Sequence, residues 1–203
     1  MSEVHLTAPL TEADARNLKL GDIVYITGKV FLCMTSFHVR VAEQNAPAPF
    51  DTNEYNVMWL SGLVATREGD RWKALSAGAT TSMRYEKWEP AVIERAKLRA
   101  IIGKGGMGKG TLEALRRFGC VHLGKLGMMT GALYGSCIKN IDRVHWIESG
   151  MGDAVWNLTV QDLGPTVVDM DAHGNVLYDA MFEKQTRETI PMAYRRLGLE
   201  PRR

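Results

Sequence analysis

The sequence predicts a layered α/β domain, because short apolar strands alternate along the chain with segments whose apolar residues follow helical spacing. The 203 residues are 45% hydrophobic and 24% charged, a composition typical of globular proteins. A chain of this length buries enough apolar surface to fold without disulfides or a structural metal. We expect a single domain over residues 1–182, followed by a polar, helical extension over residues 183–203.

The expected strands are short runs rich in β-branched and aromatic residues. They cover residues 22–32, 57–63, 71–77, 120–123, 144–147, 155–160, 166–170 and 176–178. Gly28 divides the first run, which is therefore one strand or two strands around a turn. The run from Val57 to Leu63 is almost continuously apolar, which predicts a strand covered on both faces.

Helices are expected between several of these strands. They cover residues 90–100, 111–118 and 128–137. The first two segments place apolar residues at helical spacing, and Gly119 ends the second. The third is rich in small residues, as in a helix that presses against a sheet. Residues 171–175 (Asp-Ala-His-Gly-Asn) predict a turn between the last two strands.

Charge and cysteine usage limit the compartment and the partners. A formal net charge of +2 is too small to favour binding to nucleic acid. The chain opens without a secretory leader, and no apolar stretch approaches the ~20 residues needed to span a bilayer. Cys33, Cys120 and Cys137 show no pairing pattern, which favours a reducing compartment. We expect a soluble cytoplasmic protein that binds neither nucleic acid nor membrane.

Small hydroxylic residues gather between Ser76 and Arg84, directly behind an expected strand. Backbone N–H groups and hydroxyls can converge there on an anion, and the Arg84 guanidinium can grip a carboxylate with two parallel hydrogen bonds. The segment therefore predicts an oxyanion or carboxylate pocket. A Ser/Thr-rich turn with a surface arginine is the simpler interpretation of the same residues.

A glycine-rich loop runs from Gly103 to Thr111. Its spacing resembles a phosphate-binding loop, but Gly110 stands where a hydroxyl should follow Lys109 to hold magnesium, so the nucleotide interpretation is weak. Alternatively, the glycines remove side chains so that Lys104 points into a cleft as a fixed positive charge. A flexible loop without a ligand is the third possibility.

The histidines and cysteines indicate no metal site. His38 follows Cys33 by five positions, and two candidate ligands do not make a metal centre, so a structural histidine is expected. The chain has no Ser-His-Asp order, no Gly-x-Ser-x-Gly motif and no clear pair of carboxylates. The residues alone therefore predict an anion pocket without a complete catalytic apparatus.

Several segments nevertheless occur in the order found in one known family. They are Thr27-Gly28, His38-Val39-Arg40, Gly78 to Arg84, Ile102 to Gly108, Val144-His145-Trp146, Gly150-Met151, Ala154-Val155-Trp156 and Asp171 to Asn175. Together they resemble the β subunit of the iron–sulfur hydro-lyases of the class I fumarase and L(+)-tartrate dehydratase type, most closely the tartrate dehydratase branch. The resemblance runs from about Leu10 to Tyr178.

This resemblance implies a swivelling β/β/α domain of the fumarase β-subunit type. It also implies a hydro-lyase, a dehydratase or hydratase that removes water from a small hydroxy acid or adds water to its product. In that family three cysteines of an α part hold a [4Fe–4S] cluster, so this chain would supply no metal ligand and would be active only with its α subunit. An αβ hetero-oligomer or a homo-oligomer is expected.

Four positions match family positions at the reacting end of the substrate. Thr80 matches a threonine proposed near the proton-transfer step, and its weakly basic hydroxyl would need an acid/base partner from the α subunit. Thr81 and Arg84 match positions at the substrate carboxylate. Lys104 matches the glycine-loop lysine that contacts substrate.

Met34 is the main departure from the family pattern. It stands at the arginine of a family run of the form A-R-D-x-x-H, which ends here at His38, and we assign Met34 and His38 to the substrate-binding set. Loss of a bidentate contact costs on the order of 2 to 4 kcal/mol, or about 30- to 1000-fold in affinity. We therefore predict a hydroxy acid whose far end is uncharged, unless Arg40 replaces the missing charge.

A second departure is Ala79, where the family has a proline before its two threonines. The two departures motivate a second hypothesis, a non-catalytic or regulatory domain that binds an anion or metabolite on the same fold. Retention of Thr80, Arg84 and Lys104 together favours the enzyme.

Overall fold

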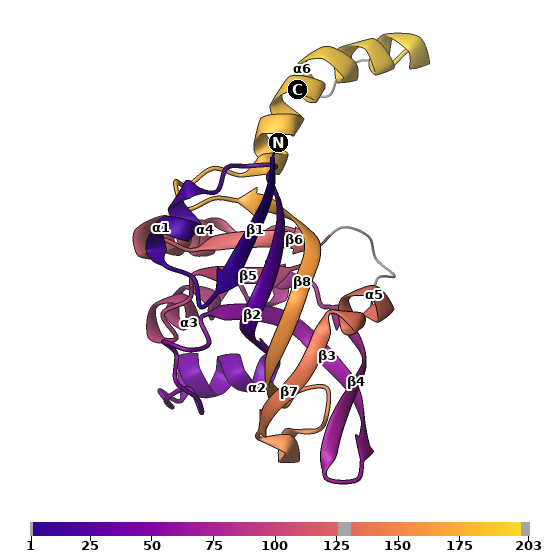
Figure 1. The fold of residues 1–203 in the computed structure, drawn as a ribbon. Helices are drawn as coiled ribbons and strands as arrows, with labels where there is room; N and C mark the ends of the chain where they lie inside the picture. The colour runs from indigo at the N-terminus through magenta and orange to yellow at the C-terminus, as the bar shows by residue number, and fades with distance from the viewer. Residues whose placement is uncertain (1, 126–130, 200–203) are drawn as a thin grey trace.

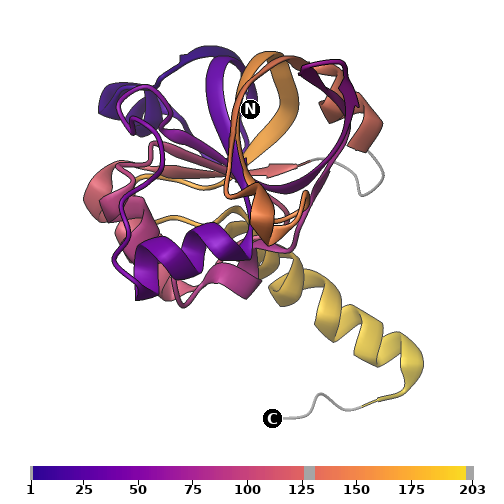
Figure 2. The same cartoon turned by 90° about the horizontal axis from the view of Figure 1, so that it is seen from below.

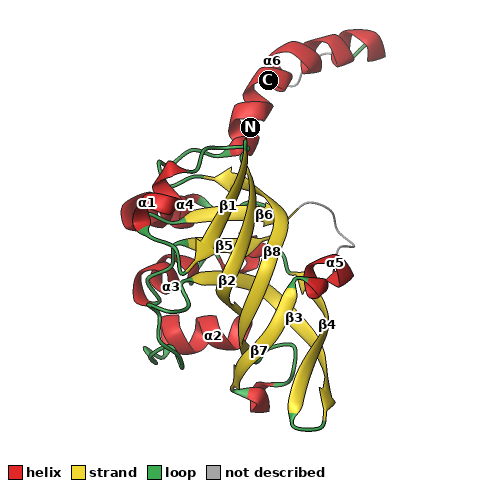
Figure 3. Cartoon of the chain, in the orientation of Figure 1, coloured by secondary structure: helices red, strands yellow, loops and turns green. Residues whose placement is uncertain are grey.

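The computed structural model describes residues 2–125 and 131–199 (Figure 1). Its strands are β1 (Glu3–Ala8), β2 (Ile23–Cys33), β3 (Val57–Glu68), β4 (Arg71–Ala79), β5 (Ala100–Gly103), β6 (Val121–Lys125), β7 (Ile138–His145) and β8 (Val155–Met170). Its α-helices are α1 (Glu12–Asn17), α2 (Thr35–His38), α3 (Glu89–Arg95), α4 (Lys109–Phe118), α5 (Gly131–Ser136) and α6 (Leu177–Leu197). A π-helical turn (Val39–Glu43) continues α2, and 3-10 turns cover Ser82–Tyr85 and Ile147–Ser149. The fold is mixed α/β, as predicted (Figure 3).

Five strands close into a ring by pairing in the order β2, β3, β5, β6, β8 and back to β2. The pairs β2–β3, β3–β5 and β5–β6 are parallel, whereas β8 is antiparallel to both β6 and β2. β8 has 16 residues and therefore reaches β7 as well. β3 continues beyond the ring into an antiparallel hairpin with β4.

Two hydrophobic cores lie on opposite faces of this ring, because successive residues of a strand point to opposite sides. Along β3, Val57 and Trp59 belong to one core, and Met58 and Leu60 belong to the other. The first core takes residues from all five strands of the ring and lies inside it, whereas the second contains the buried apolar residues of α2, α3 and α4 and lies outside. These helices line one flank of the strands (Figure 2). The prediction of a strand covered on both faces is confirmed.

Gly28 lies inside a continuous β2 rather than at a turn, which settles that alternative. Its φ of +114° is one that side chains rarely adopt, and a Cβ there would overlap the carbonyl oxygen of Ala8 on β1. The glycine therefore allows β1 to pair closely with β2.

Several expected elements have different bounds, among them the strand predicted over residues 144–147, which is the end of β7 (Ile138–His145). The helix predicted over residues 90–100 ends at Arg95, because Lys97 adopts a left-handed φ of +52° and β5 begins at Ala100. The strands predicted over residues 155–160 and 166–170 are one strand, β8. Residues 161–165 (Gln-Asp-Leu-Gly-Pro) carry turn-type residues that predict a break, but the strand continues through them.

The strand predicted over residues 176–178 is wrong. Val176 forms a single bridge with Met170, and α6 begins at Leu177. The preceding turn is confirmed, because the Asp171 carboxylate accepts hydrogen bonds from the backbone N–H groups of residues 173 and 175.

The helix predicted over residues 128–137 lies partly outside the described residues. Its described part, α5, packs against β4, and a Cβ on Gly135 would lie 3.1 Å from the Cα of Ser76. Small residues therefore do allow close contact with the hairpin, as predicted for this segment.

Helix α6 projects away from the strands (Figures 1 and 2). It begins at Leu177, so the predicted domain boundary between residues 182 and 183 falls within one helix. Several of its apolar side chains are exposed, including Phe182 at 68%. Among the described residues, no helix is long and apolar enough to cross a membrane.

Lys125, the last residue of β6, places its amine in the inner core. Its Nζ lies 4.4 Å from the centre of the Trp59 ring and 4.0 Å from that of Tyr134, and it donates a 3.4 Å hydrogen bond to the Ala77 carbonyl. Burial lowers the pKa of Lys125 to about 7. The folded chain therefore binds fewer protons than the unfolded chain between pH 7 and 10.5.

We predict that Lys125→Met stabilises the protein at pH 7 and that this gain shrinks as the pH rises toward 10.5. The wild type gains stability with rising pH in this window, by at most about 1.4 kcal/mol per pH unit from this group, whereas the variant lacks that slope. Urea unfolding of both chains at several pH values measures the difference. Parallel stability curves would contradict the assignment.

Candidate active site

The predicted site residues meet where parallel strands end. Met34 follows β2, and Lys104 follows β5. Both strands pair with the first half of β3, through Cys33 with Leu60 and through Ile102 with Trp59. The carboxyl ends of neighbouring parallel strands are a common place for ligands, because the loops that follow them converge.

The end of β4 returns to the same place from the opposite direction. The backbone N–H of Thr80 donates a 3.2 Å hydrogen bond to the carbonyl of Leu60. Thr81 forms a parallel bridge with Lys104, and the Ser82 N–H donates a 3.1 Å hydrogen bond to the Lys104 carbonyl. The hydroxylic segment and the glycine-loop lysine, predicted separately, are therefore adjacent.

Arg84 lies in the 3-10 turn that Ser82 begins, two residues beyond the contact with Lys104. Its side chain is exposed, whereas Lys104 is half-buried. The backbone thus places the two cations on the same edge of the molecule, which is the requirement for holding one small anion between them.

Tyr85 is a buried residue of the same 3-10 turn, and no sequence pattern pointed to it. Burial raises the pKa of Tyr85, and hydrogen bonding with the side chains of Thr35, at the start of α2, and Thr80 opposes this rise only in part, so the phenol stays protonated at neutral pH. The Tyr85 hydroxyl therefore lies between Thr80 and the loop that carries Met34.

His38 supports this loop from behind. It is fully buried, with Nδ1 2.7 Å from the Met34 carbonyl oxygen and Nε2 3.0 Å from the Glu89 carboxylate. Its ring lies 4.4 Å from the ring of Tyr85. Both ring nitrogens have protein partners, so His38 supports the structure of this loop. A contact between His38 and the substrate stays a prediction.

The Met34 side chain lies over the hairpin, with its sulfur 3.3 Å from the position that a Cβ on Gly62 would take. Arg40 points to other partners: it donates a 3.2 Å hydrogen bond to Glu148 and lies 4.4 Å from the centre of the Trp146 ring. These contacts hold the Arg40 guanidinium at Glu148 and Trp146, so the positive charge of Arg40 is not available at the Met34 end of the site.

Glu86 occupies the N-terminus of α4. Its carboxylate accepts hydrogen bonds from the backbone of Gly108 at 2.7 Å and of Thr111 at 3.1 Å, and from the Thr111 hydroxyl at 2.6 Å. A nucleotide phosphate would need these same donors. The structure therefore does not support the phosphate-loop interpretation, and the absence of side chains at Gly108 and Gly110 makes room for Glu86.

The cysteines do not fit an iron–sulfur cluster. Cys33, Cys120 and Cys137 are all buried and free, and burial raises the pKa of the Cys33 and Cys120 thiols. Within residues 2–125 and 131–199, no three His, Cys, Asp or Glu side chains gather as a metal site would require.

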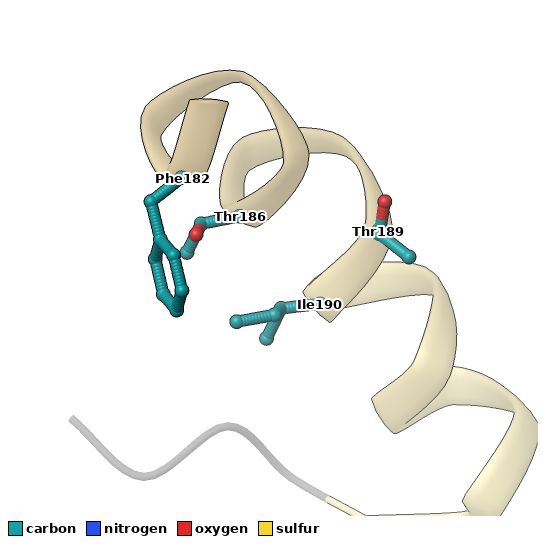
Figure 4. Close-up of a pocket in the computed structure, with 4 residues that line it drawn as sticks. All are labelled: Phe182, Thr186, Thr189 and Ile190. Atoms are coloured by element: carbon teal, nitrogen blue, oxygen red, sulfur yellow. The ribbon is translucent and has the colours of Figure 1, made fainter. Parts of the chain in front are cut away.

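A hollow of about 380 Å³ lies elsewhere, on α6 (Figure 4). Phe182 and Ile190 point toward it, and Thr186 and Thr189 complete its lining. None of these side chains carries a charge that could hold a carboxylate. We therefore place the candidate site at the strand ends.

The fold and these residues define an α/β domain with hydroxyls and cations at the carboxyl ends of its parallel strands. The family model described as Fumarase C-terminus matches residues 1–181. The chain therefore belongs to the fumarase C-terminus family.

Individual relatives agree with this family. The chain is 35% identical over 172 residues to the L(+)-tartrate dehydratase subunit beta of Escherichia coli (strain K12), covering 85% of each chain. It is 37% identical over 179 residues to the "Putative L(+)-tartrate dehydratase subunit beta" of Methanocaldococcus jannaschii, covering 86% of this chain and 91% of the relative. A "Putative fumarate hydratase class I" of Geobacillus stearothermophilus is 35% identical over 187 residues, which are 92% of this chain and 35% of that longer protein.

We predict that His38→Leu destabilises the protein by about 3 to 5 kcal/mol, because it leaves the Glu89 carboxylate buried without its partner. The double variant His38→Leu/Glu89→Leu should recover much of this loss, since it removes the unpaired charge. Urea unfolding measures both. Glu113→Ala is the control, because its ion pair with Arg116 is exposed and its loss should change little. A double variant as unstable as His38→Leu would contradict the assignment.

Proposed function

We propose that this chain is the β subunit of an iron–sulfur-dependent hydro-lyase that removes water from a small hydroxy carboxylic acid, or adds water to its product. Membership of the fumarase C-terminus family and the names of the relatives support this activity. The observation that carries the proposal is the pairing of Thr81 and Ser82 with Lys104, which gathers hydroxyls and cations at one edge.

The chemistry of these groups suits an anionic substrate. We assign the substrate carboxylate to Thr81, Arg84 and Lys104, since two cations and a hydroxyl satisfy a carboxylate by charge-assisted hydrogen bonds. Thr80 is assigned to the proton-transfer step. Its hydroxyl is weakly basic and needs an acid/base partner, which we assign to the α subunit.

The α subunit also supplies the cofactor in this proposal. The three cysteines of this chain are buried, and no metal-binding group of side chains gathers among the described residues, so we assign the [4Fe–4S] cluster to the α subunit. When bound there, its open iron would act as a Lewis acid on the leaving hydroxyl. The β subunit alone is then inactive, and substrate binds between the subunits.

The remaining features follow from the same assignment. We propose that the domain swivels against the α subunit to close the shared site. Three free thiols suit a reducing compartment, and we place the complex in the cytoplasm as an αβ hetero-oligomer.

A non-catalytic anion-binding domain is the second candidate, motivated by Met34 and Ala79. Thr80 argues against this second candidate, because binding an anion needs no hydroxyl beside a buried tyrosine. Purification discriminates the two. A brown, iron-containing partner that co-purifies supports the hydro-lyase, and a colourless homo-oligomer that binds a metabolite supports the alternative.

We predict that Thr80→Val lowers kcat of the reconstituted αβ complex by about 100-fold or more, because a residue in proton transfer contributes 10²- to 10⁴-fold. Thr80→Ser should retain most activity, since it keeps the hydroxyl. Steady-state kinetics with the best hydroxy acid measures both. Thr81→Val is the comparison and should act mainly on KM; if it lowers kcat more than Thr80→Val, the proton-transfer role belongs to Thr81 instead.

We predict that the wild-type complex prefers a hydroxy acid with an uncharged far end, and that Met34→Arg shifts this preference toward dicarboxylates by about 30-fold or more. A substrate panel of mono- and dicarboxylic hydroxy acids gives kcat/KM for both proteins. Arg40→Ala is the control: unchanged dicarboxylate binding shows that Arg40 does not replace the missing arginine. Equal or better turnover of L-tartrate or malate than of every mono-anionic acid would contradict the prediction.

A further inference from the structure

We propose that Ser82, His122 and Asp169 form a buried relay that positions Lys104 for the substrate carboxylate. Its consequence for catalysis rests on the function proposed above, whereas its geometry does not. The three residues come from the 3-10 turn after β4, from β6 and from β8. None of them contacts the substrate in this proposal, so they are positioning residues.

The contacts form one continuous chain. The backbone N–H of Lys104 donates a 3.0 Å hydrogen bond to Ser82 Oγ. Ser82 Oγ lies 3.1 Å from His122 Nε2, and His122 Nδ1 lies 2.5 Å from Asp169 Oδ1. All three side chains are at most 1% exposed, so water does not compete for these bonds.

One assignment of protons satisfies every contact. Because Ser82 Oγ accepts from Lys104, its own proton is free for His122 Nε2. The Nδ1–H of His122 then donates to Asp169. Each group in this series donates to the next, from Lys104 to Ser82, His122 and finally the Asp169 carboxylate. The negative charge at the end therefore strengthens each hydrogen bond back to Lys104.

Two glycines make room for the relay. Gly103 and Gly124 pair with each other on β5 and β6. A Cβ on Gly103 would overlap Ser82 Oγ and lie 2.6 Å from His122 Nε2, and a Cβ on Gly124 would lie 2.6 Å from Asp169 Oδ2. A side chain at either position would displace the relay residues, so the relay requires glycine at positions 103 and 124.

A nucleophilic role for Ser82 does not fit these facts. The same three residue types activate a serine in hydrolases, but Ser82 is completely buried and its oxygen already accepts from Lys104. Since Thr81 and Ser82 are both bonded to Lys104, the relay instead locks the threonine segment to the glycine loop.

The experiment uses the αβ complex with Ser82→Ala, Asp169→Asn and the double variant. Ser82→Ala should raise KM about five- to ten-fold and change kcat less than about three-fold. A displaced Lys104 weakens binding of the substrate and of the transition state equally, which affects KM and not kcat. Asp169→Asn should raise KM by less. The double variant should match Ser82→Ala, since Asp169 acts on Lys104 only through Ser82.

A structural control and a second readout complete the test. Thr166→Val removes another fully buried hydroxyl, which donates to the Val24 carbonyl, and should lower the melting temperature without raising KM. Hydrogen exchange at the Lys104 amide should accelerate in Ser82→Ala and Asp169→Asn but not in Thr166→Val. Additive effects on KM, an equal rise in Thr166→Val or unchanged exchange at Lys104 would overturn the relay.

The exchange readout also separates the two proposals. If the wild-type complex converts no hydroxy acid, the proposed function fails, and the Lys104 exchange rates alone decide whether the relay exists.

Discussion

Parallel pairing of β2 and β5 with the first half of β3 places the candidate site. The loops after β2 and β5 emerge at the same edge, and the hairpin returns the end of β4 to that edge through the hydrogen bond from Thr80 to Leu60. Thr81 and Lys104, which are well separated in the sequence, are therefore neighbours. The closed ring fixes these ends, because each strand in it is paired on both sides.

Buried histidines stabilise the two halves of the site in similar ways. His38 joins Glu89 to the loop of Met34, and His122 joins Asp169 to the turn of Ser82. Burying a carboxylate is costly unless it is hydrogen-bonded, so each pair stabilises only the arrangement in which its partners are in place. Such pairs favour a defined geometry at the strand ends over a loose one.

The sequence predicted those parts of the fold that have a local pattern. The apolar run Val57–Leu63 predicted a strand covered on both faces, and both cores contain its residues. Gly119 predicted the end of a helix, and it adopts a left-handed φ of +65° there. The hydroxylic segment and Lys104 were found as separate motifs, and only the fold shows that they are adjacent. Tyr85, His122 and Asp169 had no detectable pattern, because their partners lie on other strands and their roles come from burial.

We propose that Arg84 and Lys104 hold the carboxylate of a hydroxy acid at the ends of β2, β4 and β5. The most direct measurement is a crystal structure of the αβ complex with a bound hydroxy acid. We predict carboxylate oxygens within hydrogen-bond distance of both cations and of the Thr81 hydroxyl. An acid bound at another surface of the β subunit, with these side chains unoccupied, would contradict it.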